Sequence, residues 1–295
     1  MKLILDTSIL IVTVMMMLAI GMQLAREPNL TRAPRLGSLA LILILHMCLL
    51  PLLAWFTCRW LEIRPALAIG LLVVAACPVG DISNFYVWLV RGNVWVSLWL
   101  NVVSCLFAVA SMAGIYHLYS WLSGSPFLMA LPTLGMVVRL LALIVLPLSA
   151  GILAGWRFPC AADVLTPWLR RATGAGILWV VCLIVVMRWG QLREEAAEAA
   201  LASLVFLSLA TITGVGAALL VTRSRRERIA IAFSFPVRNV GLATALVVIL
   251  MNQVGYAAFA VVYFVVEVFF MLAVAGITAR ICPAGCEETT GLGAS

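Results

Sequence analysis

Two long apolar segments of this chain are each interrupted by a polar, proline-bearing stretch. The first segment, Ala66–Val90, is interrupted by CPVGDISN at 77–84, and the second, Ile229–Leu250, by SFPVRNVG at 234–241. In a bilayer, each backbone N–H and C=O that an interruption frees must find a partner within the protein, so interruptions persist only where they line a cavity or a packed site. A matched pair of them is typical of a transporter's binding site.

The rest of the sequence predicts an all-α polytopic membrane protein. The chain is 65% apolar and 11% charged, and its charges fall between apolar runs of about 17–25 residues, the length that spans a bilayer. We expect about nine transmembrane helices, over Thr7–Leu24, Gly37–Cys58, Ala66–Val90 (broken), Val94–Trp121, Phe127–Leu153, Ala172–Met187, Ala200–Val221, Ile229–Leu250 (broken) and Val254–Thr278.

The basic residues predict how the chain is oriented. Twelve arginines flank one membrane face and five basic residues flank the other, which places the C-terminus in the cytoplasm and the N-terminus outside. The first helix is expected to be retained, because no clear signal-cleavage site follows it. We expect a bacterial inner (plasma) membrane location, with the lipid bilayer and a small-molecule solute as partners and no nucleic acid. The oligomeric state is left open.

The two broken helices are the third and the eighth. Equivalent helices five positions apart cross the membrane in opposite directions, as in an inverted repeat. We therefore expect one transmembrane domain over residues 1–282, with repeats of about 1–122 and 123–282. Residues 283–295 are expected to form a disordered cytoplasmic tail.

Four charged residues, Asp81, Arg139, Arg238 and Glu267, lie at membrane depth. Each costs about 2.5–3.5 kcal/mol at the bilayer centre, so such residues face the bundle interior and have partners. Asp81 is expected to cap the half-helix that follows it, to bind a ligand, or both. Arg238 needs an acid, carbonyl groups or an anionic ligand. Glu267 is the obvious acid, and the pair either only stabilises the bundle or takes part in function.

Other chemistry-bearing residues are few. His46, in the second helix, is expected to hydrogen-bond another helix or to carry a proton. No His-Glu-x-x-His or Gly-x-Ser-x-Gly motif is present, so an enzyme is not expected. Cys282 and Cys286 form the only close cysteine pair. No further cysteine or histidine lies near them in the sequence, so neither a metal site nor a cofactor is predicted.

The interruptions resemble motifs of the bile acid:sodium symporter family. Its first broken helix reads roughly CPGGTxSN, then LxRGD, where this chain has CPVGDISN and LVRGN at 89–93. Its second reads ExGxQNxGLA, where this chain has SFPVRNVGLA at 234–243. The chain is identified as a divergent member, with the sister arsenite permeases more distantly similar. The resemblance implies a core domain that crosses its two broken helices and a panel domain that moves against the core.

The resemblance also implies two sodium sites that drive organic anion uptake. By position, the first would involve Ser83, Asn84, Ser97, Asn101 and a family glutamate that falls on Ser234; the second would combine that glutamate with family glutamines at His46 and Arg238. Sodium prefers oxygen ligands, and their charge sets its affinity. Both sites are therefore expected to be degraded, with the Arg238 guanidinium as a built-in cation that Glu267 neutralises.

The leading hypothesis is a secondary transporter of a small organic solute, in particular an organic anion, with altered or sodium-independent coupling. Its substrate would bind near Asp81, Ser83, Asn84, Arg238 and Asn239. Glu267, Asp81 and His46 are the candidates for a coupling proton. One alternative is a metalloid or oxyanion efflux permease, although the metalloid-binding cysteine of the arsenite permeases falls on Val79 here. Another is a non-transporting membrane scaffold or sensor.

Overall fold

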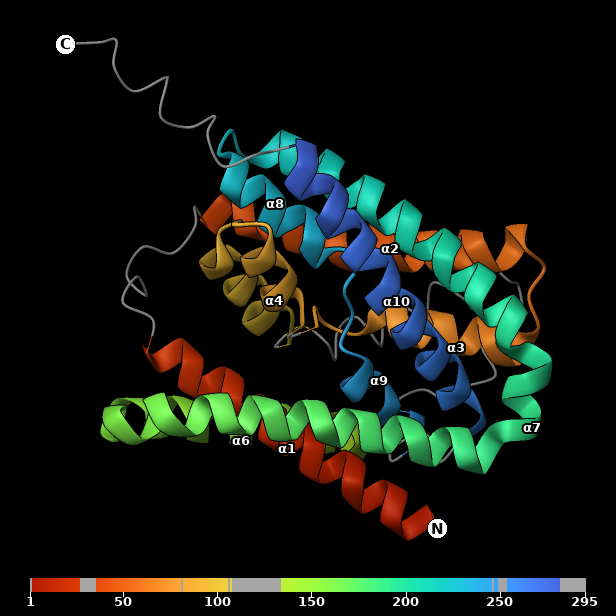
Figure 1. Ribbon diagram of the computed structural model, residues 1–295, viewed down its shortest axis with the longest axis horizontal. Helices are drawn as coiled ribbons and strands as arrows, with labels where there is room; N and C mark the ends of the chain where they lie inside the picture. Colours follow the sequence, from red (N-terminus) through yellow and green to blue (C-terminus); the bar gives the residue numbers. More distant parts are fainter. Residues whose placement is uncertain are drawn as a thin grey trace.

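The computed structural model describes residues 2–26, 36–80, 82–105, 107, 134–245, 247–248 and 254–281, which are almost entirely helical (Figure 1). The prediction of an all-α polytopic membrane protein is confirmed. The helices are α1 (Lys2–Arg26), α2 (Leu36–Trp60), α3 (Pro65–Ala76), α4 (Ile82–Leu89), an unlabelled helix Val94–Cys105, α6 (Leu134–Arg157), α7 (Pro159–Val221), α8 (Arg225–Ser234), α9 (Val240–Ala245) and α10 (Val254–Ile281).

Five spans among the described residues are long and apolar enough to cross a membrane. They lie in α1, α2, α10 and the two limbs of α7, and two further apolar helices, α3 and Val94–Cys105, are shorter. Several of the nine predicted spans do not appear as single long helices, because the third and eighth are interrupted and the predicted helix Val94–Trp121 extends beyond the described residues. Asp81 and the predicted tail 283–295 also lie outside the described residues.

Helix α7 corrects the sequence prediction. Two helices, Ala172–Met187 and Ala200–Val221, were expected with a non-helical connection between them, but α7 runs without interruption from Pro159 to Val221, and the two expected spans lie in its two halves. The expected connection is rich in alanine, glutamate and arginine, which are strong helix formers, and contains no proline. Figure 1 shows α7 as two limbs that meet at a sharp bend; we call Pro159–Met187 the first limb and Arg193–Val221 the second limb.

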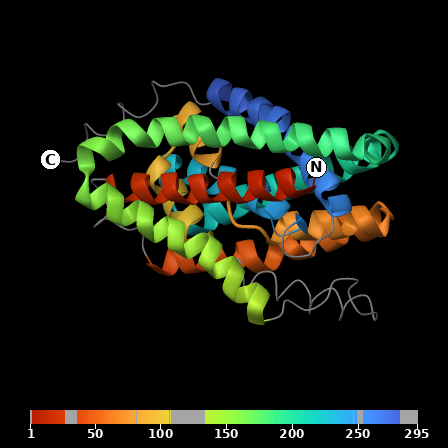
Figure 2. The same cartoon turned by 90° about the horizontal axis from the view of Figure 1, so that it is seen from below.

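One layer of the molecule consists of α1, α6 and the first limb of α7. Figure 2 shows α1 between the other two, and α1 packs closely on both. Gly21 of α1 and Gly151 of α6 face each other, and a Cβ on either would collide with a carbonyl oxygen, of Leu148 or Leu18 respectively. Small residues of this kind let two membrane helices approach at backbone distance, so this layer is held together by close contact between main chains.

The second layer holds both interrupted segments. Helix α3 packs against α2 and α10, α4 packs against α8, and α10 packs along α7. The third segment divides into α3 and α4, and the eighth into α8 and α9. Because α9 also contacts α1, the two interruptions lie close to the junction of the layers.

Candidate functional site

The two interruptions meet in a short antiparallel bridge between Val79 and Arg238. The Gly80 N–H donates to the Val237 carbonyl at 3.0 Å, and the Asn239 N–H donates to the Pro78 carbonyl at 3.0 Å. These bonds satisfy backbone groups that the breaks free from the helices. A Cβ at Gly80 would lie 2.6 Å from the Arg238 carbonyl oxygen, so this close approach of two main chains needs a glycine.

The Arg238 guanidinium lies against the C-terminal end of α3. Its side chain is buried, with 2% of the residue exposed. Nη2 donates to the carbonyls of Ala75 (2.6 Å) and Cys77, and Nε donates to the Val74 carbonyl at 3.4 Å. Nη1 contacts His46 Nε2. The last carbonyls of a helix have no partner within it and carry partial negative charge, so this cation both satisfies and neutralises them.

The contact between Glu267 and Arg238 differs from the expected contact between the carboxylate and the guanidinium. The Arg238 backbone N–H, rather than the guanidinium, donates to Glu267 Oε2, at 3.3 Å. Glu267 is fully buried, and its Oε1 has no hydrogen-bond partner among the described residues. The ion pairs found in the described part of the chain involve Arg26 and Arg64 and leave out Arg238. Backbone carbonyls, rather than the Glu267 carboxylate, therefore accept the hydrogen bonds of the guanidinium.

The other positions of the implied sodium sites are buried but neutral. Ser83 Oγ of α4 lies 3.1 Å from Ser97 Oγ of helix Val94–Cys105, and Asn84 and Asn101 are buried on the same two helices. Ser234 Oγ donates back to the Ala230 carbonyl of its own helix at 2.7 Å. Within the described ranges, no three His, Cys, Asp or Glu side chains gather where they could hold a metal ion.

A cavity of about 320 Å³ opens beside the bridge, at the junction of the layers. One wall comes from the interruptions, including Gly80, Arg238 and Asn239, and the facing wall comes from the first limb of α7. This volume is in the range of small-molecule sites, about 300–1,000 Å³. Of the predicted substrate residues, Arg238 and Asn239 line it. Ser83 and Asn84 are absent from its described lining, and Asp81 lies outside the described residues.

A model of the sodium bile acid symporter family matches residues 9–195, more than half of the chain. This chain belongs to that family. The match includes the first interruption and ends before the second.

Several relatives in this symporter family share low sequence identity with the chain. The human sodium-dependent organic anion transporter is 23% identical over 250 residues, which are 83% of this chain and 64% of the relative. Human sodium/bile acid cotransporter 4 is 30% identical over 116 residues, 39% of this chain and 26% of the relative. A probable chloroplastic sodium/metabolite cotransporter of Arabidopsis thaliana is 26% identical over 146 residues, 47% of this chain and 33% of the relative. The chain thus spans less than two thirds of the length of these relatives.

Three cavity residues of this symporter-family chain were not expected from the sequence. Arg170 and Arg171 are two of the twelve arginines expected to flank the cytoplasmic membrane face, and Thr173 carried no sequence signal, yet all three line the cavity from α7. The helix starts at Pro159, so at about 1.5 Å per residue it has risen roughly 18 Å by Arg171. Removing these two arginines from the twelve leaves the predicted charge asymmetry in place, at ten against five.

Proposed function

We propose that this protein is a secondary transporter that moves a small organic anion across the membrane, and that it does so without sodium at the bridge. The observation that carries the proposal is the cavity between the interruptions and α7, which arginines line from both walls. The named relatives are sodium-dependent organic anion and bile acid transporters, rather than enzymes. The proposal includes a single transmembrane domain over residues 1–282 with an inverted repeat, and a C-terminus in the cytoplasm.

The position of Arg238 supports the loss of sodium. In transporters with broken helices, the C-terminal carbonyls of a half-helix often bind the cation, and here the guanidinium already occupies those of α3. A second positive charge about 4 Å away would be repelled by about 4 kcal/mol at an effective dielectric constant of 20. The family glutamate that would offset this repulsion is Ser234 here, and its hydroxyl is bonded to Ala230.

Two of the predicted proton carriers, His46 and Glu267, differ in whether they keep an atom without a hydrogen-bond partner. His46 Nε2 contacts the Arg238 guanidinium. Glu267 retains one oxygen without a partner among the described residues. An oxygen without a partner can take up or release a proton without breaking another hydrogen bond, so Glu267 is the better candidate for proton coupling.

Replacing sodium by potassium or choline is expected to leave anion uptake unchanged within about twofold. The physical reason is that no sodium has to bind before substrate when Arg238 supplies the positive charge. The measurement is uptake of a panel of radiolabelled organic anions into proteoliposomes with matched ionic strength. Liposomes without protein set the background. An uptake that falls to background without sodium would contradict the proposal, and no uptake of any anion would favour a scaffold or sensor.

Restoring the family residues is expected to create sodium dependence. The triple variant His46→Gln, Ser234→Glu, Arg238→Gln returns three ligand positions to the types that the resemblance implies. Sodium at 100 times its dissociation constant would then stabilise the folded state by about 2.7 kcal/mol. The measurement is the apparent melting temperature in detergent with sodium or choline chloride. The wild-type protein is the control and should show no difference between the two salts, so a wild type that sodium stabilises would contradict the argument.

A further inference from the structure

Two buried donors without a hydrogen-bond partner among the described residues, and one exposed cation, belong to residues that line the cavity beside the bridge. The donors are Asn239 Nδ2 and Thr173 Oγ1, and the cation is Arg171 of α7. Buried donors in folded proteins nearly always have partners, so a group of orphans in one cavity indicates a missing acceptor.

Asn239 is held in one orientation by its own helix. Its Oδ1 accepts the Leu242 N–H at 2.9 Å and so caps α9. This bond directs Nδ2 away from the cap, and Nδ2 has no partner among the described residues although only 2% of Asn239 is exposed. A buried amide N–H₂ offers two donors and accepts nothing, so the missing group is an acceptor.

Thr173 differs from the other hydroxyl residues of α7. The other five donate to the carbonyl four residues earlier: Thr166, Ser203, Ser208, Thr211 and Thr213. Thr173 is 6% exposed, and its Oγ1 makes no hydrogen bond within the described structure. A helical threonine normally satisfies its hydroxyl on its own backbone, so the unpartnered hydroxyl of Thr173, on a residue that lines the cavity, indicates a missing hydrogen-bond partner there.

Arg171 adds a charge to the same wall. Its guanidinium lies over the Trp168 ring, 5.8 Å from the ring centre, and among the described residues it forms no ion pair. Stacking on an aromatic ring orients a guanidinium and leaves its in-plane donors free. No acidic side chain is among the described residues that line the cavity. The cavity therefore favours a ligand that is anionic and rich in acceptors.

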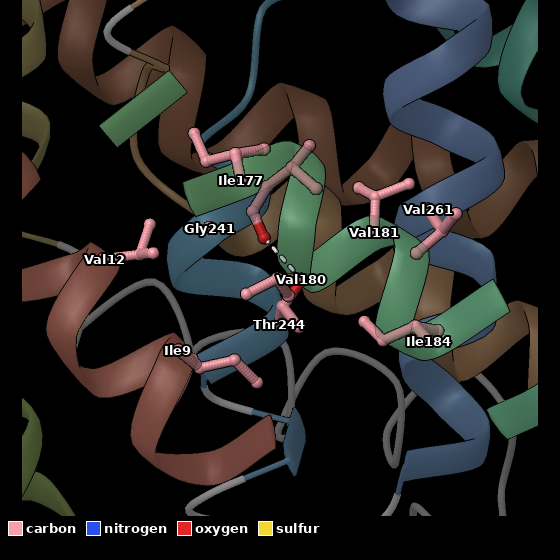
Figure 3. Close-up of a pocket in the computed structure, with 10 residues that line it drawn as sticks. Ile9, Val12, Ile177, Val180, Val181, Ile184, Gly241, Thr244 and Val261 are labelled. Atoms are coloured by element: carbon pink, nitrogen blue, oxygen red, sulfur yellow. Dashed lines mark hydrogen bonds between the residues drawn. The ribbon is translucent and has the colours of Figure 1, made fainter. Parts of the chain in front are cut away.

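A small aliphatic pocket between the layers adjoins the cavity. Figure 3 shows side chains from α1, α7, α9 and α10 around this pocket, which has a volume of about 20 Å³. It shares Ile177, Val240 and Gly241 with the larger cavity. Thr244, its one hydroxyl residue, donates to the Val240 carbonyl, so the pocket offers an apolar surface with room for about one methyl-sized group.

We propose that Asn239 Nδ2, Thr173 Oγ1 and Arg171 bind the carboxylate of a short-chain aliphatic monocarboxylate, one terminal methyl group of which enters the pocket of Figure 3. This assignment rests on the proposed function and names its substrate class. The ligand bridges the two layers, because Asn239 belongs to the interruption and the other two residues to the first limb of α7. One carboxylate has two oxygens with about four lone-pair sites, enough for all three donors.

Binding of isovalerate to the purified full-length protein tests the assignment. Isothermal titration in sodium-free buffer compares three probes: isovalerate, its neutral amide isovaleramide, and sulfate. We expect isovalerate to bind and the other two to bind at least about tenfold more weakly, since one lacks the charge and the other lacks the alkyl group. If either isovaleramide or sulfate binds as tightly as isovalerate does, the assignment is overturned.

Matched variants locate the site. Thr173→Val keeps the shape of the side chain and removes the hydroxyl, and it should weaken isovalerate binding roughly tenfold or more, as should Arg171→Gln. Thr166→Val is the control, because its hydroxyl is bonded to Ala162, and it should bind as the wild type does. Unchanged affinity in Thr173→Val, with an unchanged melting temperature, would overturn the assignment.

The test of this binding site and the test of the proposed transport function can give different results. If proteoliposomes take up an organic anion but isovalerate binding ignores Thr173, the transport proposal stands and this site is wrong. If isovalerate binds in a Thr173-dependent way but no anion is transported, the site stands and the transport proposal is wrong.

Discussion

Replacing Arg238 with methionine is expected to lower the free energy of unfolding by roughly 3 kcal/mol. The substitution keeps most of the apolar stem but removes the donors that satisfy the Ala75 and Cys77 carbonyls and His46. Each buried acceptor that loses its partner costs about 1–3 kcal/mol, and the recovered desolvation of the guanidinium offsets part of this. The measurement is the apparent melting temperature of the purified protein in detergent.

Two further variants show whether the loss of stability in Arg238→Met comes from the hydrogen bonds of the guanidinium. Arg193→Met changes an exposed arginine on α7 and should shift the free energy of unfolding by no more than about 0.5 kcal/mol. Glu267→Gln should be much milder than Arg238→Met, because the Glu267 side chain accepts only a backbone N–H, and a glutamine oxygen can accept the same bond. Equal losses in Arg238→Met and Glu267→Gln, without additivity in the double variant, would indicate an ion pair between the side chains and contradict the structure.

The substitution Gly80→Ala is expected to cost about 3 kcal/mol and to abolish transport. The added Cβ would lie 2.6 Å from the Arg238 carbonyl oxygen and 2.9 Å from its carbon, and both are backbone atoms that cannot rotate away. Relief requires the two interruptions to separate, which breaks the bonds from Gly80 to Val237 and from Asn239 to Pro78. Overpacking costs about 1–3 kcal/mol, and each lost hydrogen bond costs about 1 kcal/mol more.

The matched control for this prediction is Gly276→Ala in α10. Nothing lies within 4 Å of a Cβ at Gly276, so this substitution should stabilise the helix by up to about 1 kcal/mol through its backbone propensity. Melting temperature and anion uptake are measured for both variants. If Gly80→Ala matches Gly276→Ala in both measurements, the close approach of the two interruptions is wrong.

Much of the fold could be predicted from the sequence because it depends on local patterns. Apolar runs of spanning length predict membrane helices, and proline with polar residues inside such runs predicts where a helix must break. Helices α3 and α8 end at Ala76 and Ser234, at the edge of the predicted stretches. The continuity of helix α7 was not predicted, because its charged middle has the hydropathy of a loop although its residues favour a helix.

The residue types of the candidate site could be predicted from the sequence, but the hydrogen-bond partners of those residues could not. A buried arginine at membrane depth requires acceptors, and the sequence offered Glu267 as the nearest charge of opposite sign. The acceptors in the structure are carbonyls of α3, more than 160 residues away in the chain. Backbone carbonyls occur at every residue, so composition and spacing cannot indicate which of them a side chain reaches.

The sequence by itself therefore determined that this protein is a helical membrane protein of the symporter family with two interruptions at membrane depth. The tertiary structure alone decided that the backbones of Gly80 and Arg238 approach closely, that the guanidinium donates to the carbonyls at the end of α3, and that Thr173 is among the residues that line the cavity. The physical reason is that hydrogen bonds act over about 3 Å, so they depend on how distant segments are placed against one another, which no local pattern in the sequence records.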